Sequence, residues 1–384
     1  MRLAILGAAL LVVGAASILT GVLPVVEALA VGERVWPILL FAVAITIVAE
    51  LAAEAGVFTA VAERLARIGL GRAWVLWLLV VLLAIGCTIF LSLDTTAVLL
   101  TPVVVLLARH NGLPPLPFAL TTVWLANTGS LLLPVSNLTN LLALDALGFH
   151  DPARFAALMA APAVVAIVVP CVAIAVIFRR DLGGRYVGSA IDQVPDRPLF
   201  VLSAVVVASL LPLLVSGMPV WLPSSAAAVV LVGAFLARRR RVLRFDLVPW
   251  QIILFASGLF LVVEAAHGVG LTTALAVVAG EGDDPLALLR LAVAGMVGAN
   301  GIDNLPAYLA LEPVTGSAPR LAALLVGVNA GSLITPWASL AVLLWHRGLV
   351  ALGVEFRWSR YVVLGLVVAP VTVALATLAL AATV

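Results

Sequence analysis

Lysine is absent from this 384-residue sequence, and charged residues of all kinds make up only 10% of it. Soluble domains contain about a quarter charged residues, whereas 64% of this chain is apolar. A water-soluble fold of that composition would have almost no polar surface to present to the solvent. The 21 basic residues, all arginine, nearly balance the 19 acidic ones, and the net charge of +2 gives no reason to expect a nucleic-acid partner.

Cysteine is scarce as well. Cys87 and Cys171 both lie in apolar runs, and neither has the spacing of a metal site or of a disulfide framework. We therefore expect no metal and no cofactor.

Long runs without a charged residue dominate what is present. Each exceeds twenty residues, and a helix that rises about 1.5 Å per residue then crosses about 30 Å of hydrocarbon. The sequence therefore predicts an all-α polytopic membrane protein. The uncharged runs are residues 3–26, 73–93, 110–144, 155–178, 198–237 and 321–346.

An internal repeat links the two halves of the chain. Residues 36–62 align without a gap to residues 250–276, so that Trp36 falls on Trp250 and Glu50 on Glu264. Because further matches follow in the same order, we interpret the halves as two copies of one unit. These matches are Leu93-Asp94-Thr95 with Ile302-Asp303-Asn304, Asn127-Thr128-Gly129-Ser130 with Asn329-Ala330-Gly331-Ser332, and Ala161-Pro162 with Ala369-Pro370.

Each copy is predicted to contain two helices, a re-entrant hairpin with a polar cluster at its tip, a broken helix and a last helix. Four crossings per copy and one joining helix make about nine full crossings plus two hairpins, and the odd helix inverts the second copy. This is the inverted-repeat plan of secondary transporters. We expect a first repeat at 1–178, a linker and joining helix at 179–218, and a second repeat at 219–384.

The arginines predict the orientation. All but four of the 21 fall on one side of this topology, and the positive-inside rule places that side, with the N-terminus, in the cytoplasm and the C-terminus outside. The four exceptions are Arg34, Arg154, Arg290 and Arg320.

Two acidic residues are predicted to lie inside the membrane. Asp94 and Asp303 each sit at the middle of a hairpin, and no arginine lies in the core of an expected span. Ionisable groups at that depth are energetically expensive and usually functional. A lone carboxyl group there should bind a proton or a cation during part of its cycle. We predict that both carry the coupling ion, a proton or sodium.

Neutral polar residues surround the predicted helix breaks at 129–134 and 331–336. Unwound backbone at that depth must be buried or line a cavity, and although small residues also serve helix packing, two copies beside acidic hairpins favour a substrate site. The predicted substrate-binding residues are Thr95, Thr96, Asn127, Thr128, Ser130, Ser136, Asn137, Asn304, Asn329, Ser332, Thr335 and Ser339.

Glu50 and Glu264 are secondary candidates, because they lie toward helix ends where a solvated or scaffold role fits equally well. A cavity with two carboxyl groups and no arginine should repel a multiply charged anion unless cations bind with it. It favours a cation or a small neutral polyhydroxylated solute.

Several motifs between about residue 35 and the C-terminus resemble the arsenical-pump membrane protein family, within a wider ion-transporter superfamily of permeases. They are Leu91-x-x-Asp94-x-x-Ala97-x-x-Leu100-Thr101-Pro102, Leu133-x-x-Ser136-Asn137-Leu138-x-Asn140, Pro249-Trp250-Gln251-Ile252, Asp303-Asn304-Leu305-Pro306 and Ile334-Thr335-Pro336-x-x-Ser339.

The resemblance implies a bacterial plasma-membrane transporter, not an enzyme, with scaffold and transport domains and an elevator-like cycle. Such proteins export arsenite and antimonite by proton exchange or with a separate arsenical-pump ATPase. Trivalent arsenic is a neutral trihydroxide near neutral pH, which agrees with an uncharged polar lining. Where the family has Asn-Asp and Asn-Asn, this chain has Leu93-Asp94 and Asp303-Asn304. The coupling ion, its stoichiometry and the oligomeric state stay open.

Two other functions would also use acidic residues inside the membrane. A cation/proton antiporter on the same scaffold would also use two acidic hairpins. An aspartyl intramembrane protease would need two carboxyl groups that share a proton, but such enzymes resemble one another in Gly-x-Gly-Asp. The contexts here are Ser92-Leu93-Asp94 and Gly301-Ile302-Asp303.

Overall fold

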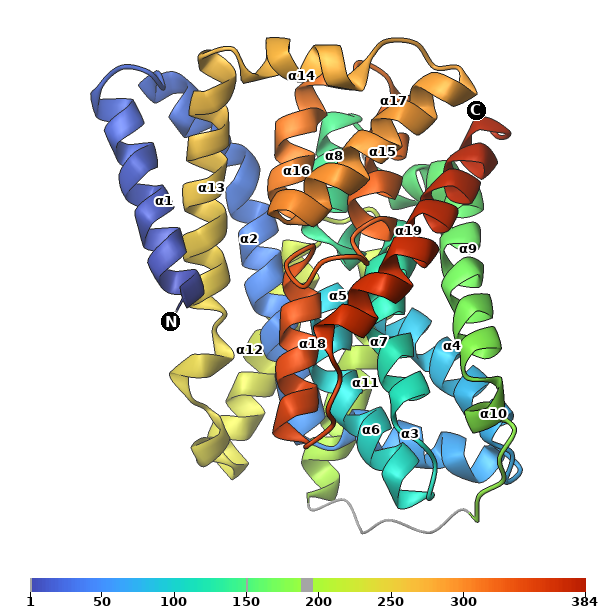
Figure 1. Cartoon of the computed structure of the whole chain (residues 1–384). Helices are drawn as coiled ribbons and strands as arrows, with labels where there is room; N and C mark the ends of the chain where they lie inside the picture. The colour runs from blue at the N-terminus through green and yellow to red at the C-terminus, as the bar shows by residue number, and fades with distance from the viewer. Residues whose placement is uncertain (1, 150, 188–195) are drawn as a thin grey trace.

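A computed structural model describes residues 2–149, 151–187 and 196–384, and within them the chain is almost entirely helical (Figure 1). Residues 188–195 of the expected linker lie outside the described residues. The helices of the first half are α1 (Arg2–Leu19), α2 (Val25–Glu54), α3 (Val57–Ile68), α4 (Ala73–Leu91), α5 (Leu93–Thr95), α6 (Thr101–His110), α7 (Leu116–Thr128), α8 (Leu138–Ala146), α9 (Pro152–Ile177) and α10 (Arg179–Leu182).

The joining helix is α11 (Arg197–Leu214), and the second half follows it with the same sequence of elements. Its helices are α12 (Trp221–Arg238), α13 (Trp250–Gly268), α14 (Leu271–Ala279), α15 (Pro285–Ile302), α16 (Asn304–Leu311), α17 (Ala318–Leu325), α18 (Leu340–Ala351) and α19 (Trp358–Ala381).

The predicted inverted repeats are confirmed. The hairpin of α4, α5 and α6 enters from the lower end in Figure 1 and the hairpin of α15 and α16 from the upper end, and their tips approach each other near the middle. The exchange of partners agrees with this symmetry, because α1 packs against α13 whereas α12 packs against α2. Gly56 and Gly270, which match in the sequence repeat, both take positive φ values, 87° and 102°, at equivalent helix starts.

Both predicted broken helices are present. Between α7 and α8 the chain forms two short 3-10 turns, at Gly129–Leu131 and Pro134–Ser136. Between α17 and α18 a π-helical turn at Val326–Ala330 leads into irregular backbone that ends at Ser339. Each break leaves backbone groups without helical hydrogen-bond partners near the membrane centre, where only protein or a cavity can satisfy them.

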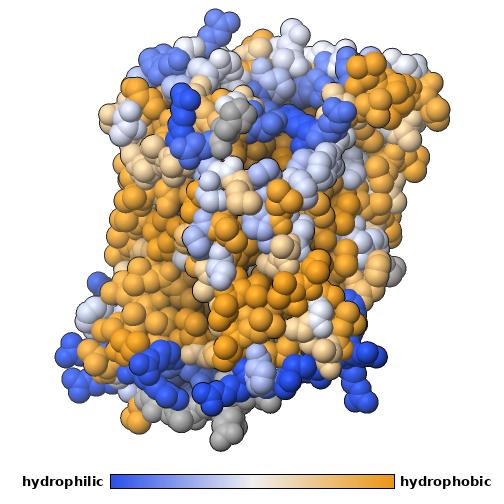
Figure 2. Space-filling model, turned by 180° about the vertical axis from the view of Figure 1, so that it is seen from behind, coloured by the Kyte–Doolittle hydropathy of each residue, from blue (hydrophilic) through white to orange (hydrophobic). Residues whose placement is uncertain are grey.

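The surface is that of a membrane protein. Within the described residues, nine helices are long and apolar enough to cross a membrane. They include three hairpin arms and omit α1 and the two broken helices, so they are not the same set as the nine crossings of the topology. Figure 2 shows a mostly hydrophobic middle with the most hydrophilic residues toward the two ends. The chain is therefore an integral membrane protein.

Two of the arginines, Arg34 and Arg320, lie within helices. Arg34 belongs to α2, which begins at Val25. Arg320 is only 4% exposed and donates hydrogen bonds to backbone carbonyls of Thr315, Gly282 and Gly280. It therefore holds the end of α14 and the next loop against α17 and is no free surface charge.

Candidate functional site

Each hairpin turns at a residue whose backbone is strained. Ser92 has φ 101° and ψ 159°, and Asp303 has φ 97° and ψ 153°, a region that is almost reserved for glycine. The Ser92 hydroxyl accepts a hydrogen bond from the Thr95 amide, and the Asp303 carboxylate accepts one from the Leu305 amide. Both tip residues thus cap the N-terminus of the returning arm.

This shared geometry corrects the register of the sequence repeat. In the backbone, Asp303 is equivalent to Ser92, and Asp94 lies two residues farther along its hairpin. Sequence matching paired the two aspartates because it compared residue types without the turn. The two carboxyl groups therefore have different surroundings, although both lie at hairpin tips.

A cavity of about 240 Å³ brings Asp94 and Asp303 together. The hairpin tips form one side, and apolar residues of α2 and α13, such as Phe41 and Ile252, form the other. Asp94 Oδ1 is buried and has no hydrogen-bond partner within the described residues. The described lining contains no basic side chain, and its other polar members are Ser92, Asn137, Asn304 and Thr46, with the indole of Trp337.

Most of the predicted Asn, Ser and Thr residues lie instead where the two broken helices meet. The Asn329 amide is the centre: its oxygen accepts hydrogen bonds from Asn137 at 2.9 Å and Thr139 at 3.0 Å, and its nitrogen donates to Asn140 at 3.0 Å. The Ser332 hydroxyl contacts the Asn127 side-chain oxygen at 3.1 Å. Because these bonds satisfy one another, they join the two repeats.

The remaining predicted residues lie close to the hairpins or the breaks. The Thr96 hydroxyl donates to the Ser92 carbonyl and contacts Thr88 across the first hairpin. The hydroxyls of Ser130 and Ser136 donate to the carbonyls of Asn127 and Ile89. Thr95 is buried at the first tip, and the buried hydroxyls of Thr128 and Ser339 have no partner within the described residues.

Asn300 was not among the predicted residues, yet it makes several contacts next to the second hairpin tip. Its side-chain nitrogen donates to the Met296 and Gly331 carbonyls, and its side-chain oxygen accepts from the amides of Ile334 and Thr335. The Thr335 hydroxyl and the Trp337 indole both donate to the Asn300 carbonyl. One side chain thus fixes the second hairpin to the unwound backbone after the π-helical turn.

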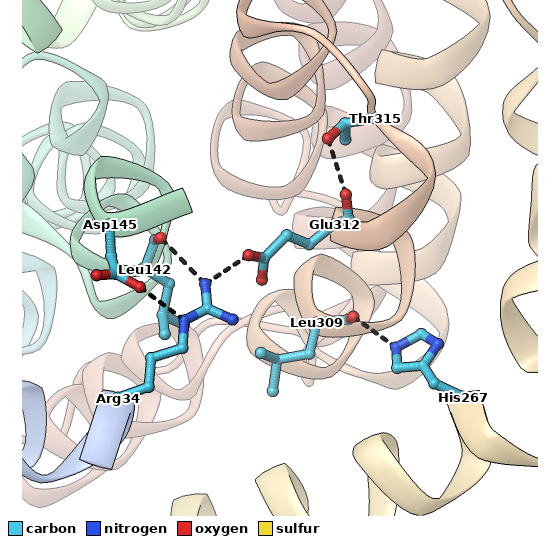
Figure 3. Close-up of polar contacts among 7 residues, drawn as sticks. All are labelled: Arg34, Leu142, Asp145, His267, Leu309, Glu312 and Thr315. Atoms are coloured by element: carbon cyan, nitrogen blue, oxygen red, sulfur yellow. Dashed lines mark hydrogen bonds and ion pairs between the residues drawn. The ribbon is translucent and has the colours of Figure 1, made fainter. Parts of the chain in front are cut away.

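The secondary candidates lie far apart along the membrane normal. Glu50 is near the end of α2, in the half of the molecule from which the first hairpin enters. Glu264 lies near the opposite end on α13 and lines a second cavity of about 440 Å³, together with Arg34, His267 and Glu312. Figure 3 shows Arg34 between Asp145 and Glu312 in this region.

Comparisons with known proteins agree with a transporter. A family model described as a citrate transporter matches residues 2–327. The arsenical pump membrane protein of Escherichia coli strain K12 is 30% identical over 392 residues, which cover 95% of this chain and 91% of that protein. The putative arsenical pump membrane protein of Bacillus subtilis strain 168 is 26% identical, with coverages of 85% and 83%.

A solved structure has the same fold. The YdaH transporter of Alcanivorax borkumensis, whose crystal structure is described as having an unusual topology, superimposes with a TM-score of 0.55. The match covers 95% of this chain and 87% of that one, at 16% sequence identity. At that identity the likeness concerns the fold alone.

Proposed function

Since the chain belongs to the citrate transporter family and to the arsenical pump membrane proteins, we propose that it is a secondary active transporter that exports arsenite and antimonite in exchange for protons. One observation carries the proposal: two hairpins of opposite origin bring Asp94 and Asp303 to a single cavity whose described lining has no basic side chain.

The lining suits a neutral solute better than an anion. A citrate-like anion would face two carboxyl groups without a compensating arginine, and at low dielectric that repulsion is strong. A trihydroxide carries no charge and can both donate and accept hydrogen bonds. We propose that it binds beside Asn304 and Asn137 on the cavity wall. Asn137 also donates to Asn329 and so connects the cavity to the contacts between the broken helices. The hydrogen bonds of Asn329 with Thr139 and Asn140 would instead hold the two broken helices in place.

The coupling proton would bind at Asp94 first. Its orphaned oxygen, away from any arginine, is a group that a proton can neutralise. Asp303 would bind a second proton while its other function, capping α16, continues. In this scheme a proton entering from outside replaces the solute, so that the two never occupy the cavity together.

We further propose an elevator-like movement. The repeats at 1–178 and 219–384, with the joining segment at 179–218 between them, would form a scaffold around α2 and α13 and a moving part around the hairpins. The arginine distribution supports an N-terminus in the cytoplasm and a C-terminus outside. A bacterial plasma membrane supplies the proton gradient that this exchange needs.

A cation/proton antiporter is the second candidate, because two carboxyl groups in one cavity also suit a bound sodium ion. A vesicle assay separates the two functions. In everted vesicles an antiporter would dissipate a pH gradient when sodium is added, whereas the proposed exporter would do so when arsenite is added.

Expression in an arsenite-sensitive bacterial strain tests the proposal. We expect cells that make the protein to accumulate less arsenite than cells with the empty vector, and a protonophore to abolish the difference. If the difference survives the protonophore and disappears only when ATP is depleted, an associated ATPase drives export and proton exchange is wrong. Equal accumulation with and without the protein would contradict the export function itself.

A further inference from the structure

The second cavity lies at the end of the molecule that carries α14 and the C-terminus (Figure 1). Helices α2 and α13 form one wall, and α8, α16 and the start of α17 form the other. The two cavities share no lining residue. The cavity of about 440 Å³ is thus separate from the one that contains Asp94 and Asp303.

The same helix faces line both cavities. On the second hairpin, Leu305 faces the first cavity, while Leu309 and Glu312 face the second. Spacings of four and three residues keep these side chains on one helix face. On α2, Leu39 lines the first cavity and Val35, four residues earlier, lines the second. Four residues span about 6 Å along a helix, so a single apolar layer about one turn thick separates the cavities.

Polar contacts join the two walls of the second cavity. Arg34 on α2 donates to Asp145 at 3.0 Å and to the Leu142 carbonyl at 3.2 Å, and it pairs with Glu312 at 2.5 Å. From α13, His267 Nε2 donates to the Leu309 carbonyl at 3.1 Å (Figure 3). The two scaffold helices thus hold the second hairpin and α8 from two directions.

Glu264 and Arg34 both offer polar atoms to a ligand in this cavity. The carboxylate of Glu264 has no hydrogen-bond partner in the described part of the chain, and none of the described hydrogen bonds of Arg34 uses Nη1. One acceptor and one donor suit a small neutral solute with several hydroxyl groups. In the sequence repeat Glu264 corresponds to Glu50, which lies toward the opposite membrane face. This is the arrangement expected if each repeat supplies one carboxylate to the opening of the transport path on its own side of the membrane.

We propose that this cavity is the outer vestibule of the transport path, where Glu264 binds the neutral polyhydroxylated solute as it leaves. The inference rests on the proposed export function for the identity of the solute. The apolar layer separates the vestibule from the cavity that contains Asp94 and Asp303. Exchange of solute between the two cavities requires the second hairpin to move relative to α2 and α13.

Transport kinetics from each side test the role of Glu264. With Glu264→Gln we expect the external arsenite concentration that half-inhibits efflux from right-side-out vesicles to rise about tenfold, the effect of losing one charged hydrogen bond. The KM at the cytoplasmic face, measured with everted vesicles, should change less than twofold. Glu281→Gln is the control, because Glu281 is an exposed acid at the same end and does not line the cavity. Equal changes at both faces, or none at either, would overturn the proposal.

Thiol labelling tests the vestibule without the solute, which itself reacts with thiols. In a Cys87→Ala/Cys171→Ala background, Val263→Cys should react with a membrane-impermeant maleimide added outside and not with the same reagent added to everted vesicles. Labelling from the cytoplasmic side only, or from neither side, would mean that the cavity is not an outer vestibule. If labelling succeeds and the unmodified protein exports no arsenite, the proposed function fails and the vestibule stands.

Discussion

Replacement of Asp94 by asparagine is expected to reduce arsenite export to the level of the empty vector. Asparagine has nearly the same shape, so the hairpin should pack as before, but the amide cannot take up and release a proton. In the unmodified protein Asp94 Oδ1 is buried and has no hydrogen-bond partner within the described residues. Export is measured as cellular arsenite after loading, normalised to the amount of protein in the membrane.

Two further variants make this result specific. Asp303→Asn should reduce export less and lower the number of protons exchanged per solute, because asparagine can still accept the Leu305 amide bond as a helix cap. Glu355→Gln changes an exposed acid in the loop before α19 and should export normally. If Asp94→Asn retained more than half of the export, this carboxyl group would not carry the coupling proton.

Replacement of Gly365 by alanine is expected to prevent correct folding. Gly365 lies in α19, and an added Cβ would be 2.1 Å from the Leu333 carbonyl oxygen and 2.8 Å from the Ile334 Cα. Both neighbours belong to the backbone of the broken segment, which Asn300 fixes in place, so neither can move cheaply. Overpacking costs about 1–3 kcal/mol and occasionally more, and rigid backbone neighbours place this substitution at the upper end of that range. We expect little monodisperse protein in size-exclusion chromatography and a much lower thermal-unfolding midpoint.

Gly348→Ala is the matched control for this prediction. Gly348 lies in α18, and a Cβ added there meets no atom within 4 Å. Alanine should stabilise that helix by about 1 kcal/mol, because glycine is a poor helix former. If Gly365→Ala behaved like Gly348→Ala, the close approach of α19 to the broken segment would be wrong.

The hairpins and helix breaks could be predicted because the membrane restricts what a polar or helix-breaking residue can do. Asp94, Asp303 and the Gly-Ser…Pro segments have few possible positions in lipid other than a tip or a break. The duplication then gave the topology, since a second copy of each feature had to occupy an equivalent place. The exact position of each turn could not be predicted, because neither serine nor aspartate is a residue type that indicates the positive φ found at Ser92 and Asp303.

The partners of the polar residues could not be predicted from local sequence. Asn137 and Asn329 meet only because the two repeats dock against each other, and the residues are 192 positions apart. Arg34 and Glu312 are 278 positions apart, and nothing in the sequence near either residue indicates the other. Such contacts depend on how the helices pack against one another, and the spacing of residues within one helix does not predict that packing.

Transport by the purified protein in liposomes tests the central claim most directly. Arsenite and sodium are supplied in parallel to liposomes with an acidic interior, and both solute uptake and the internal pH are followed. The account predicts that arsenite accumulates while protons leave, that sodium has no effect, and that Asp94→Asn abolishes both fluxes. A pH gradient that collapses on addition of sodium but not of arsenite would contradict it.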